Sequence, residues 1–537
     1  MLDFLPVPTA FQAVAAGHKP DILDCLNNLS SDEVFTPPLV ARQVLDLLPA
    51  EIWSDPTLKL LDPACKSGVF LREAAARLMI GLADALPDES ARRRHIFGTM
   101  LHGLAITELT GLISRRSVYC SKDAASEFSV VPLPGASGNI EYRRGSHVYK
   151  NRKCRFCGAP EGSLDRGEHL ENYAYSFIHA SDPKELFPMK FDVIIGNPPY
   201  QLQDAGESTG ASPIYQLFVE QAKKLEPRYI SFIIPARWYA GGKGLDGFRE
   251  TMLNDRRISH LVDYHDASDC FPGVEIKGGV CFFLWDAKHK GDCEVTSVVH
   301  GQKLEPMSRS LGKYDVLVRS NEAISILDKV QQKGEPSFSE RISRQKPFGF
   351  RTNFTDYQSE PSDGAIPIYA NKDIGWIDRS AVTVGTEMID EHKVLISKAY
   401  NGGDNYPHQI INRPILAPKA SCCTETYIVC GFCPSLEEAQ NIEAYIKTRF
   451  FRFMVSLRKI SQDNPRDRFD FVPDLDMTHT WTDALLYARY GLTGEEIGFI
   501  EGMIKEMPPR PNSGEQYGGE AEVGKGGKRT TSSPIPL

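Results

Sequence analysis

Residues 191–200 read Phe-Asp-Val-Ile-Ile-Gly-Asn-Pro-Pro-Tyr. An apolar, β-branched run that stops at a glycine and is followed at once by Asn197, two prolines and an aromatic is typical of a buried strand that delivers a rigid loop to a sheet edge. Parallel α/β sheets build their sites at such strand ends. The stretch therefore predicts a parallel α/β sheet with a functional loop at residues 197–200.

The chemistry that this loop suggests is the capture of a planar ring carrying an amino group. The Asn197 side-chain oxygen and the Pro198 carbonyl oxygen can both accept hydrogen bonds from one exocyclic NH2. Tyr200 can stack on the face of the ring. Two acceptors on one amino group leave its nitrogen lone pair free to attack an electrophile.

A second strand end lies upstream, where residues 60–71 read Leu-Leu-Asp-Pro-Ala-Cys-Lys-Ser-Gly-Val-Phe-Leu and continue into a helical run at 72–78. A strand, a Ser/Gly turn and a helix N-terminus let backbone amides approach a ligand. Gly68 permits close contact in such a turn. The sequence thus predicts a ligand site that uses both strand ends.

Together with Ser-Asp-Glu-Val-Phe-Thr-Pro-Pro at residues 31–38, these motifs resemble, in order and spacing, those of restriction-modification DNA adenine methyltransferases. That family uses S-adenosylmethionine to methylate adenine N6. The resemblance continues from residue 196 to residue 285. It implies a Rossmann-like S-adenosylmethionine-dependent methyltransferase domain at residues 1–289. It also implies double-stranded DNA as the partner, with the target adenine flipped out of the stack, and a cognate restriction endonuclease as a candidate second partner.

The resemblance assigns roles to individual residues. The catalytic loop is Asn197, Pro198, Pro199 and Tyr200. Asp62 orients the methionine amino group of the cofactor, and the other residues implied to surround the cofactor are Phe35, Thr36, Pro37, Ala64, Ser67, Gly68 and Phe70. Phe35 and Phe70 fit ordinary core packing equally well.

Lys66 departs from the family pattern, because many members have glycine there. Its amine could contact the carboxylate of the cofactor, with the long stem letting the charge reach outward, or it could hinder cofactor binding. The acid that holds the ribose is also displaced. Glu108 is the nearest candidate, and it could instead be an acidic residue that favours the start of a helix at 109–116. Asp182 is the candidate for the cofactor adenine.

A CxxC pair, Cys154-Arg-Phe-Cys157, lies on a basic, turn-like stretch between the two halves of the catalytic domain, in an expected insertion at about 117–170. Three thiols and one imidazole could hold a structural zinc ion. The candidate ligands are Cys120, His147, Cys154 and Cys157. His169 or His179 could substitute for His147, and the alternative is a pair of unrelated free cysteines.

Composition sets wider bounds. A chain of 537 residues that is 41% hydrophobic and 24% charged can bury a sizeable core, and we expect it to form two or three domains. No run of about 18 apolar residues and no secretory signal is visible, so we expect no membrane span. Twelve cysteines in a chain of this length fit reduced thiols in the cytoplasm.

The rest of the chain is expected to be a mixed α+β target-recognition domain at residues 290–507, followed by a disordered tail at 508–537. The turn at 400–406 is rich in groups that read base edges, and Thr493 and Glu496 have capping-box spacing. Net charge is −9, so DNA binding requires a local basic groove. Two clusters could supply it or could be solvated faces: Arg341, Arg344, Lys346 and Arg351, and then Arg449, Arg452, Arg458, Lys459, Arg466 and Arg468.

Three alternatives stay open at this point. The chain could be a single-chain restriction-modification enzyme with its own nuclease. Asp263 or Asp269 followed by Glu275-Ile276-Lys277 is similar to the acidic pattern of metal-dependent nucleases. The turns that surround these residues favour a structural role instead. It could methylate RNA or protein. It could also be a non-catalytic DNA-binding relative, because Lys66 and the displaced acid both depart from the family pattern.

Overall fold

The computed structural model describes residues 34–161, 174–202, 212–274, 276–371, 373–400, 407–459 and 462–507. The chain forms two compact units, Met1–Asn321 and Glu322–Leu537. The division falls later than residue 289 because β12 (Cys293–Val299) pairs in parallel with β10 (Ile258–Tyr264) in the sheet of the first unit. The expected tail at 508–537 lies outside the described residues.

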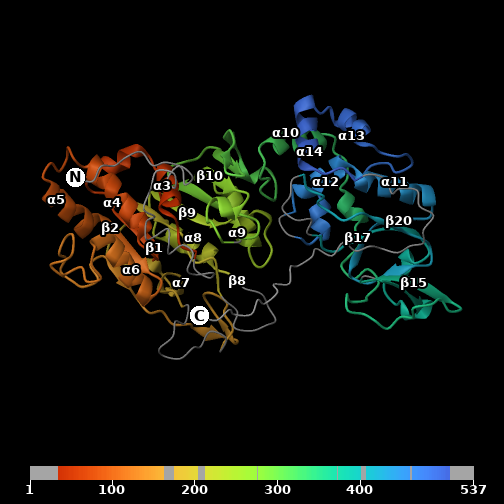
Figure 1. Cartoon of the computed structure of the whole chain (residues 1–537), viewed down its shortest axis with the longest axis horizontal. Helices are drawn as coiled ribbons and strands as arrows, with labels where there is room; N and C mark the ends of the chain where they lie inside the picture. Colours follow the sequence, from red (N-terminus) through yellow and green to blue (C-terminus); the bar gives the residue numbers. More distant parts are fainter. Residues whose placement is uncertain are drawn as a thin grey trace, which may run out of the picture. The chain divides into compact units, whose positions relative to one another are not determined.

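The first unit is built on one large sheet with the strand order β13-β12-β10-β11-β9-β6-β1-β2-β3, and β14 pairs with β12. Figure 1 labels β1, β2, β9 and β10 of this sheet. All neighbours from β3 to β9 run parallel, and β11 runs antiparallel to both β9 and β10. The remaining strands are β1 (Leu60–Cys65), β2 (Leu101–Ala105), β3 (Ile140–Tyr142), β6 (Val193–Gly196), β9 (Tyr229–Pro235), β11 (Val280–Asp286), β13 (Gln302–Lys303) and β14 (Met307–Arg309).

Helices cover both faces of this sheet, which explains why its strands read as continuous apolar runs. Val193 and Ile195 of β6 pack into one core, and Ile194 between them packs into the other. The first core includes residues of α3 (Pro38–Asp46), α4 (Val69–Gly81) and α6 (Glu108–Tyr119), and the second includes residues of α7 (Ser176–His179), α8 (Tyr215–Lys224) and α9 (Asp246–Asn254). The short helix α5 (Glu89–His95) precedes β2. The predicted doubly wound, Rossmann-like α/β fold is confirmed.

The strand order reverses between β1 and β6. The chain runs from β1 outward to β2 and β3, and later from β6 outward to β9 on the other side. In open α/β sheets, ligands bind at the carboxyl ends of the strands at such a switch point. Asp62 lies on β1 and Asn197 directly follows β6. The two sequence motifs therefore meet where this topology places a binding crevice.

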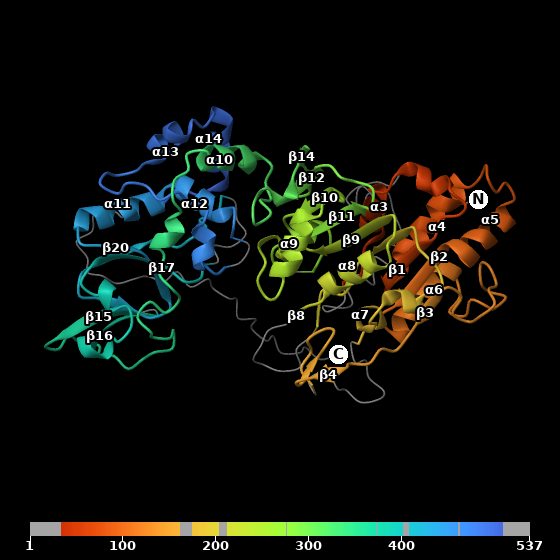
Figure 2. The same cartoon turned by 180° about the vertical axis from the view of Figure 1, so that it is seen from behind.

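The second unit is a mixed α+β unit, as expected (Figure 2). It holds two three-stranded sheets, ordered β16-β15-β19 and β18-β17-β20. Their strands are β15 (Ala365–Ala370), β16 (Asp373–Asp378), β17 (His392–Ser397), β18 (Ile415–Ala417), β19 (Cys422–Cys423) and β20 (Tyr427–Cys433), and the helices are α10 (Glu322–Gln331), α11 (Leu436–Lys447), α12 (Arg449–Ser456), α13 (Asp483–Tyr490) and α14 (Gly494–Met503).

The predicted capping box is confirmed at the start of α14, where Thr493 and Glu496 exchange side-chain to backbone hydrogen bonds. Across the described residues, every helix is too short or too polar to cross a bilayer.

Candidate active site

A narrow crevice opens at the switch point, at the carboxyl ends of β1 and β6. Its walls come from the segment before α3, from the β1–α4 turn and from the residue after β6. The lining residues are Thr36, Asp62, Ala64, Lys66, Ser67, Gly68, Val69, Phe70 and Asn197. All of these except Lys66 and Val69 are predicted site residues, so the fold brings most of the predicted cofactor set to Asn197.

Asn197 is held by its amide nitrogen. Nδ2 donates to the Val34 carbonyl oxygen at 3.1 Å and to Thr36 Oγ1 at 3.0 Å. The side chain is 3% exposed, and no described group donates to Oδ1. A buried carbonyl oxygen without a donor costs free energy in the folded protein. The two donated bonds therefore fix which end of the amide faces the crevice, and they leave its acceptor available.

Pro198 and Pro199 are buried, and the Tyr200 ring is partly buried. The Tyr200 hydroxyl is buried and makes no hydrogen bond of good geometry among the described residues. Burial raises the pKa of Tyr200 well above its usual value, although the nearby Asn197 side chain lowers it in part. The hydroxyl thus points inward and stays protonated. The ring, rather than the oxygen, is the part of Tyr200 that can meet a ligand.

Asp62 is a buried carboxylate, 2% exposed, whose Oδ1 accepts from the Ala64 backbone N–H at 3.1 Å. Burial raises the pKa of Asp62 to about 7, although the Ala64 N–H and the Lys66 charge lower it in part. Gly196 makes room for this group, since a Cβ at residue 196 would lie 2.8 Å from Asp62 Oδ1. A cationic group bound beside Asp62 would favour its ionised form.

Lys66 does not reach outward. It is only 6% exposed, and its ammonium donates to the Val34 carbonyl oxygen at 3.0 Å, the same acceptor that Asn197 uses. The amine lies 6.0 Å from the centre of the Tyr200 ring. The sequence expectation of an outward-reaching stem is wrong because a buried carbonyl offers this ammonium a direct partner inside the crevice.

Gly68 begins α4 with a left-handed φ of 75°. A Cβ there would lie 3.0 Å from the Ser114 carbonyl oxygen and 3.1 Å from Val118 Cγ2, both on α6. The glycine therefore permits a close approach of α6 to the turn, where the sequence had suggested approach of a ligand.

Replacing Gly68 with alanine should lower the free energy of unfolding by about 3 kcal/mol, because left-handed strain and crowding against α6 add. Gly247→Ala is the matched control in α9, where no atom lies within 4 Å of an added Cβ, and it should stabilise by about 0.5–1 kcal/mol. Urea unfolding of both variants measures this difference. Equal stabilities would contradict the account of the turn.

The other predicted cofactor residues lie around the crevice without lining it. Phe35 is buried and Pro37 caps α3. Glu108 is the first residue of α6, exposed, at the same sheet edge as Asp62. Asp182 is exposed, and its Oδ1 accepts from the Lys184 backbone N–H at 2.9 Å. Asp182 thus caps the short helix Pro183–Leu186 and does not reach the crevice.

Four potential metal ligands converge beside the sheet: His147, Cys154, Cys157 and His179, with one ligand atom from each lying within 4.8 Å of all the others. His179 Nε2 lies 3.2 Å from His147 Nδ1, and Cys157 Sγ lies 3.5 Å from the same nitrogen. Zinc bond lengths of about 2.0–2.1 Å to nitrogen and 2.3 Å to sulfur imply neighbouring ligand atoms about 3.3–3.8 Å apart in a tetrahedron. The separations fit such a site.

The surroundings of His179 also fit. Its Nδ1 is 2.9 Å from the Tyr175 carbonyl oxygen, which directs Nε2 toward the other three ligands. Burial lowers the pKa of His179 to about 4, so the ring is neutral at physiological pH. Burial disfavours the Cys154 thiolate, but the Cys157 and Phe156 backbone N–H groups and the His147 ring lower its pKa to about 7 overall.

Cys120 does not belong to this group, although it was a predicted ligand. It is exposed and forms the C-cap of α6. Helix α6 starts after the carboxyl end of β2 and returns the chain to the amino edge of the sheet, while the four converging residues follow the carboxyl end of β3. The length of α6 thus separates Cys120 from them, and His179 takes the fourth place.

The basic cluster predicted at 449–468 is largely internal. Arg452 is fully buried and donates to the Thr448, Lys447 and Gln409 carbonyl oxygens. Lys459 donates to the Ile410 carbonyl oxygen and to Asn464 Oδ1, both at 2.7 Å. These cations satisfy backbone carbonyl groups of the second unit and do not form an exposed groove. The predicted base-reading turn at 400–406 lies outside the described residues, apart from Tyr400.

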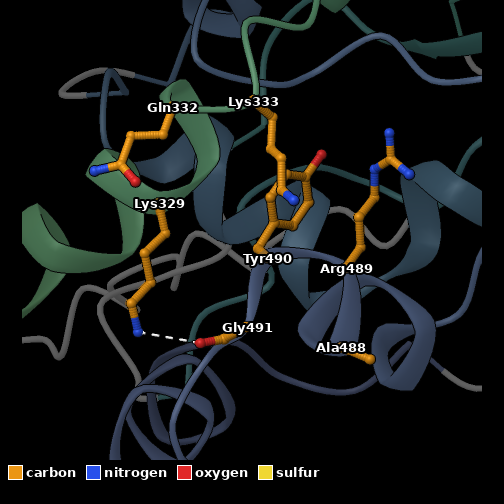
Figure 3. Close-up of a pocket in the computed structure, with 7 residues that line it drawn as sticks. All are labelled: Lys329, Gln332, Lys333, Ala488, Arg489, Tyr490 and Gly491. Carbon is orange, nitrogen blue, oxygen red and sulfur yellow. Dashed lines mark hydrogen bonds between the residues drawn. The ribbon is translucent and has the colours of Figure 1, made fainter.

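A second pocket, in the second unit, is lined by Lys329, Lys333 and Arg489 together with residues of α10 and α13 (Figure 3). Lys329 donates to the Gly491 carbonyl oxygen at 3.2 Å and pairs with Glu496, and Arg489 pairs with Glu335. Because two of its three cations are neutralised by acidic partners, this pocket has little net positive charge.

Asp263, the first residue of the pattern that is similar to nucleases, has a structural role. Asp263 is fully buried, and both carboxylate oxygens accept from Arg319 at 2.7 Å. Although burial opposes ionisation, the Arg319 guanidinium holds the pKa of the Asp263 carboxyl below its usual range. An acid already engaged on both oxygens is not available to bind a catalytic metal. Glu275 of the same pattern lies outside the described residues.

Comparison with known proteins agrees with this geometry. The Eco57I restriction-modification methylase family matches residues 99–271. An uncharacterized adenine-specific methylase of Mycoplasma pneumoniae is 39% identical over 301 residues, covering 51% of this chain and 71% of that protein. The adenine-specific methyltransferase PglX of Streptomyces coelicolor is 27% identical over 190 residues, covering 31% of this chain and 15% of its own length.

Among solved structures, the type IIL restriction-modification enzyme MmeI in complex with DNA has a TM-score of 0.43 at 11% identity, covering 80% of this chain and 62% of the MmeI chain. The type I enzyme M protein M.EcoKI has a TM-score of 0.31 at 14% identity, covering 54% of each chain. This chain thus spans less than two thirds of either structure. The family assignment depends on the sequence relatives. Because the Mycoplasma pneumoniae methylase is 39% identical and is matched over 71% of its length, the chain belongs to the adenine-specific methylases of the restriction-modification type.

Proposed function

We propose that this protein is a site-specific DNA adenine-N6 methyltransferase of a restriction-modification or phage-defence system, and that it uses S-adenosylmethionine. The observation that carries the proposal is the Asn197 amide, whose Oδ1 is a buried acceptor without a donor in the crevice that Asp62 shares. An amino group on a planar base supplies the missing donor. Family membership supports adenine as that base.

Asn197 Oδ1 and the Pro198 carbonyl oxygen accept the two N–H groups of the target amine, so its lone pair is directed away from both. The Tyr200 ring stacks on the base and offsets part of the few kcal/mol that flipping costs. No general base is required for an in-line displacement, and the surplus proton leaves to solvent or transiently through Asn197. The loop contributes chiefly by holding the two reacting centres at about 3–3.5 Å.

The crevice residues fit S-adenosylmethionine, which would supply a methyl group activated by a positively charged sulfur. Asp62 would hold the amino group of its methionine part, and Thr36, Ala64, Ser67, Gly68 and Phe70 would surround it. The Lys66 ammonium would exchange its bond to the Val34 carbonyl oxygen for the carboxylate of the cofactor. Glu108, at the same edge, remains our candidate for the ribose, whereas the exposed position of Asp182 does not support a role with the adenine.

Cofactor affinity should depend on pH through Asp62. Its pKa is raised to about 7, so below pH 7 the carboxyl is protonated and must lose its proton before it can pair with an ammonium group. We expect the Kd for S-adenosylmethionine to rise about tenfold per pH unit below 7, and to rise again above about pH 8, where the α-amino group of the cofactor loses its proton. Calorimetric titration from pH 5.5 to 8.5 measures this dependence, and Asp62→Asn should flatten it. A wild-type profile that is flat across pH 7 would contradict this role.

The acceptor class is tested by presenting labelled S-adenosylmethionine with unmethylated genomic DNA, total RNA and total protein in parallel reactions. The proposal expects label in DNA that is lost on DNase treatment. Label in RNA or protein alone would establish one of the alternative methyltransferase activities. Cofactor binding without transfer to any acceptor, or no cofactor binding, would favour the non-catalytic relative.

We further propose that the ligand set of His147, Cys154, Cys157 and His179 holds a structural zinc ion. Two thiols and two imidazoles are a common structural zinc set, closed to catalysis because all four positions are taken by protein. We also propose that the second unit recognises the DNA target, and that a cognate endonuclease acts on the same sequence. A pull-down that recovers such a nuclease with the native protein would support the last point.

A further inference from the structure

The four metal ligands hold a small hairpin with an unusual surface, formed by β4 (Tyr149–Lys150) and β5 (Lys153–Cys154). Residues 143–160 contain six Lys or Arg and no Asp or Glu, in a chain of net charge −9. Arg144, before the hairpin, is exposed, and so are four cations of the hairpin itself: Lys150, Arg152, Lys153 and Arg155. Within the described chain, none of the four forms an ion pair, and Arg155 lies over the Phe156 ring at 4.8 Å. Among the residues that the structure describes, these four charges therefore have no acidic partner.

Two features of this hairpin oppose its own stability. Lys150 and Lys153 are directly paired across the strands, and like charges in that position repel. Asn151 and Arg152 form the two-residue turn, both with left-handed φ, 53° and 61°. Asn-Gly is the favoured pair for such a turn, and arginine pays a steric cost where glycine pays none. Residues that destabilise their own local structure, such as this charge pair and this turn, are expected where a surface serves a function.

The hairpin lies at the same sheet edge as the catalytic loop. It follows the carboxyl end of β3, and residues 197–200 follow the carboxyl end of β6; β3, β2, β1 and β6 are all parallel. Three strand spacings, about 14 Å, separate the carboxyl ends of β3 and β6 in the sheet. His179 fastens the hairpin to α7, where Phe177 stacks on Phe218 of α8 at 5.8 Å. Figure 2 shows β4, α7 and β8 (Ser212–Pro213) on one side of the unit and α5 at its far end.

We propose that this metal-held hairpin is a contact site for the phosphate backbone of DNA. The inference rests on the proposed function, since it takes DNA as the substrate of the same edge. Lysine and arginine contacts to phosphate position a duplex without reading its sequence. A rigid hairpin at the same sheet edge as residues 197–200 would hold the duplex on the side where the base is flipped. The metal supplies the rigidity that a hairpin with repelling charges would otherwise lack.

The test separates affinity from stability. The triple variant Lys150→Gln, Arg152→Gly, Lys153→Gln removes three charges and restores the favoured Asn-Gly turn, so its Tm should equal or exceed that of the wild type. Its affinity for a duplex should fall about 5–10-fold per lost phosphate contact at 0.1 M salt, and the slope of log Kd against log salt should fall by about 0.9 per contact. The loss should be the same for all sequences.

The matched control is Arg94→Gln, Lys122→Gln, Lys190→Gln, which removes the same charge from exposed residues at the opposite, amino edge of the sheet. Binding is measured by fluorescence anisotropy on a duplex of about 30 base pairs, with methylation of unmethylated genomic DNA followed in parallel. If wild type methylates DNA and the two triple variants bind it equally, the hairpin proposal is overturned and the proposed function stands. If the wild type neither binds nor methylates DNA, both fall.

Discussion

Replacing Asn197 with alanine should lower the rate of methyl transfer by about a thousandfold. Preorganised hydrogen bonds in a buried site are typically worth 10²–10³-fold in rate each, and Asn197 also supplies the geometry that frees the amine lone pair. The truncation removes Oδ1 and leaves the Val34 carbonyl oxygen and Thr36 Oγ1 without the Asn197 donor. Single-turnover transfer to DNA, with wild type and variant at saturating cofactor, measures the effect.

Asn321 offers a closely matched control for the structural part of this effect. It is 6% exposed, its Nδ2 donates to the Val295 and Glu305 carbonyl oxygens, and its Oδ1 also lacks a partner. Both alanine variants should lose about 1–3 kcal/mol of stability. Only Asn197→Ala should lose transfer. Equal losses of transfer in both variants would show that Asn197 acts through the fold alone.

Removing the metal should have the second largest effect. His179→Ala should eliminate one tightly bound zinc per chain and lower the stability of the first unit by several kcal/mol, because binding free energy at a structural site is folding free energy. Cys120→Ser should retain full zinc content, since Cys120 lies at the other end of α6 from the ligand group. Metal content by atomic emission and thermal unfolding with and without chelator measure both effects.

Two outcomes would contradict the zinc assignment. One is wild-type protein purified without chelator that carries no zinc and gains no stability when zinc is added. The other is a Cys120→Ser variant that loses zinc while His179→Ala keeps it, which would restore the ligand set expected from the sequence. The same His179→Ala protein should bind DNA more weakly if the hairpin contacts phosphate, because its orientation depends on the metal.

The sequence was sufficient to predict the sheet and the meeting of its two motifs. Apolar runs that end at Asp62 and Asn197 mark adjacent strand ends, and parallel strands bring their carboxyl ends to one edge. That the first compact unit extends to Asn321 could not be predicted from the sequence. β12 adds to the sheet next to β10, which is not its sequence neighbour, and a non-local pairing leaves no local signal.

The fourth metal ligand shows a similar limit. The sequence analysis offered His179 only in place of His147, whereas the structure groups both histidines and leaves Cys120 out, because α6 carries the chain from one sheet edge to the other. Arg452 and Lys459 show a second limit. Counting charges predicted a groove, whereas Arg452 lies in a helix that is buried on nearly every side, and both cations satisfy backbone carbonyl groups that no sequence pattern reveals.

The position of the Lys66 amine was also beyond prediction, because its partner is the carbonyl oxygen of Val34. A backbone acceptor is present at every residue and gives no sequence signal. The orientation of the Asn197 amide depends on the same oxygen. Most residues that line the crevice could thus be predicted, while the hydrogen bonds that orient them needed the structure.

The most direct test of the central claim is the identity of the methylated atom. Purified protein is incubated with S-adenosylmethionine carrying a deuterated methyl group and unmethylated genomic DNA, and the DNA is then digested to nucleosides for mass spectrometry. The account predicts that the label appears as N6-methyldeoxyadenosine. Label on cytosine, or on a ring nitrogen of adenine, would contradict the role given to Asn197 and Pro198, because neither product requires two acceptors on the adenine amino group.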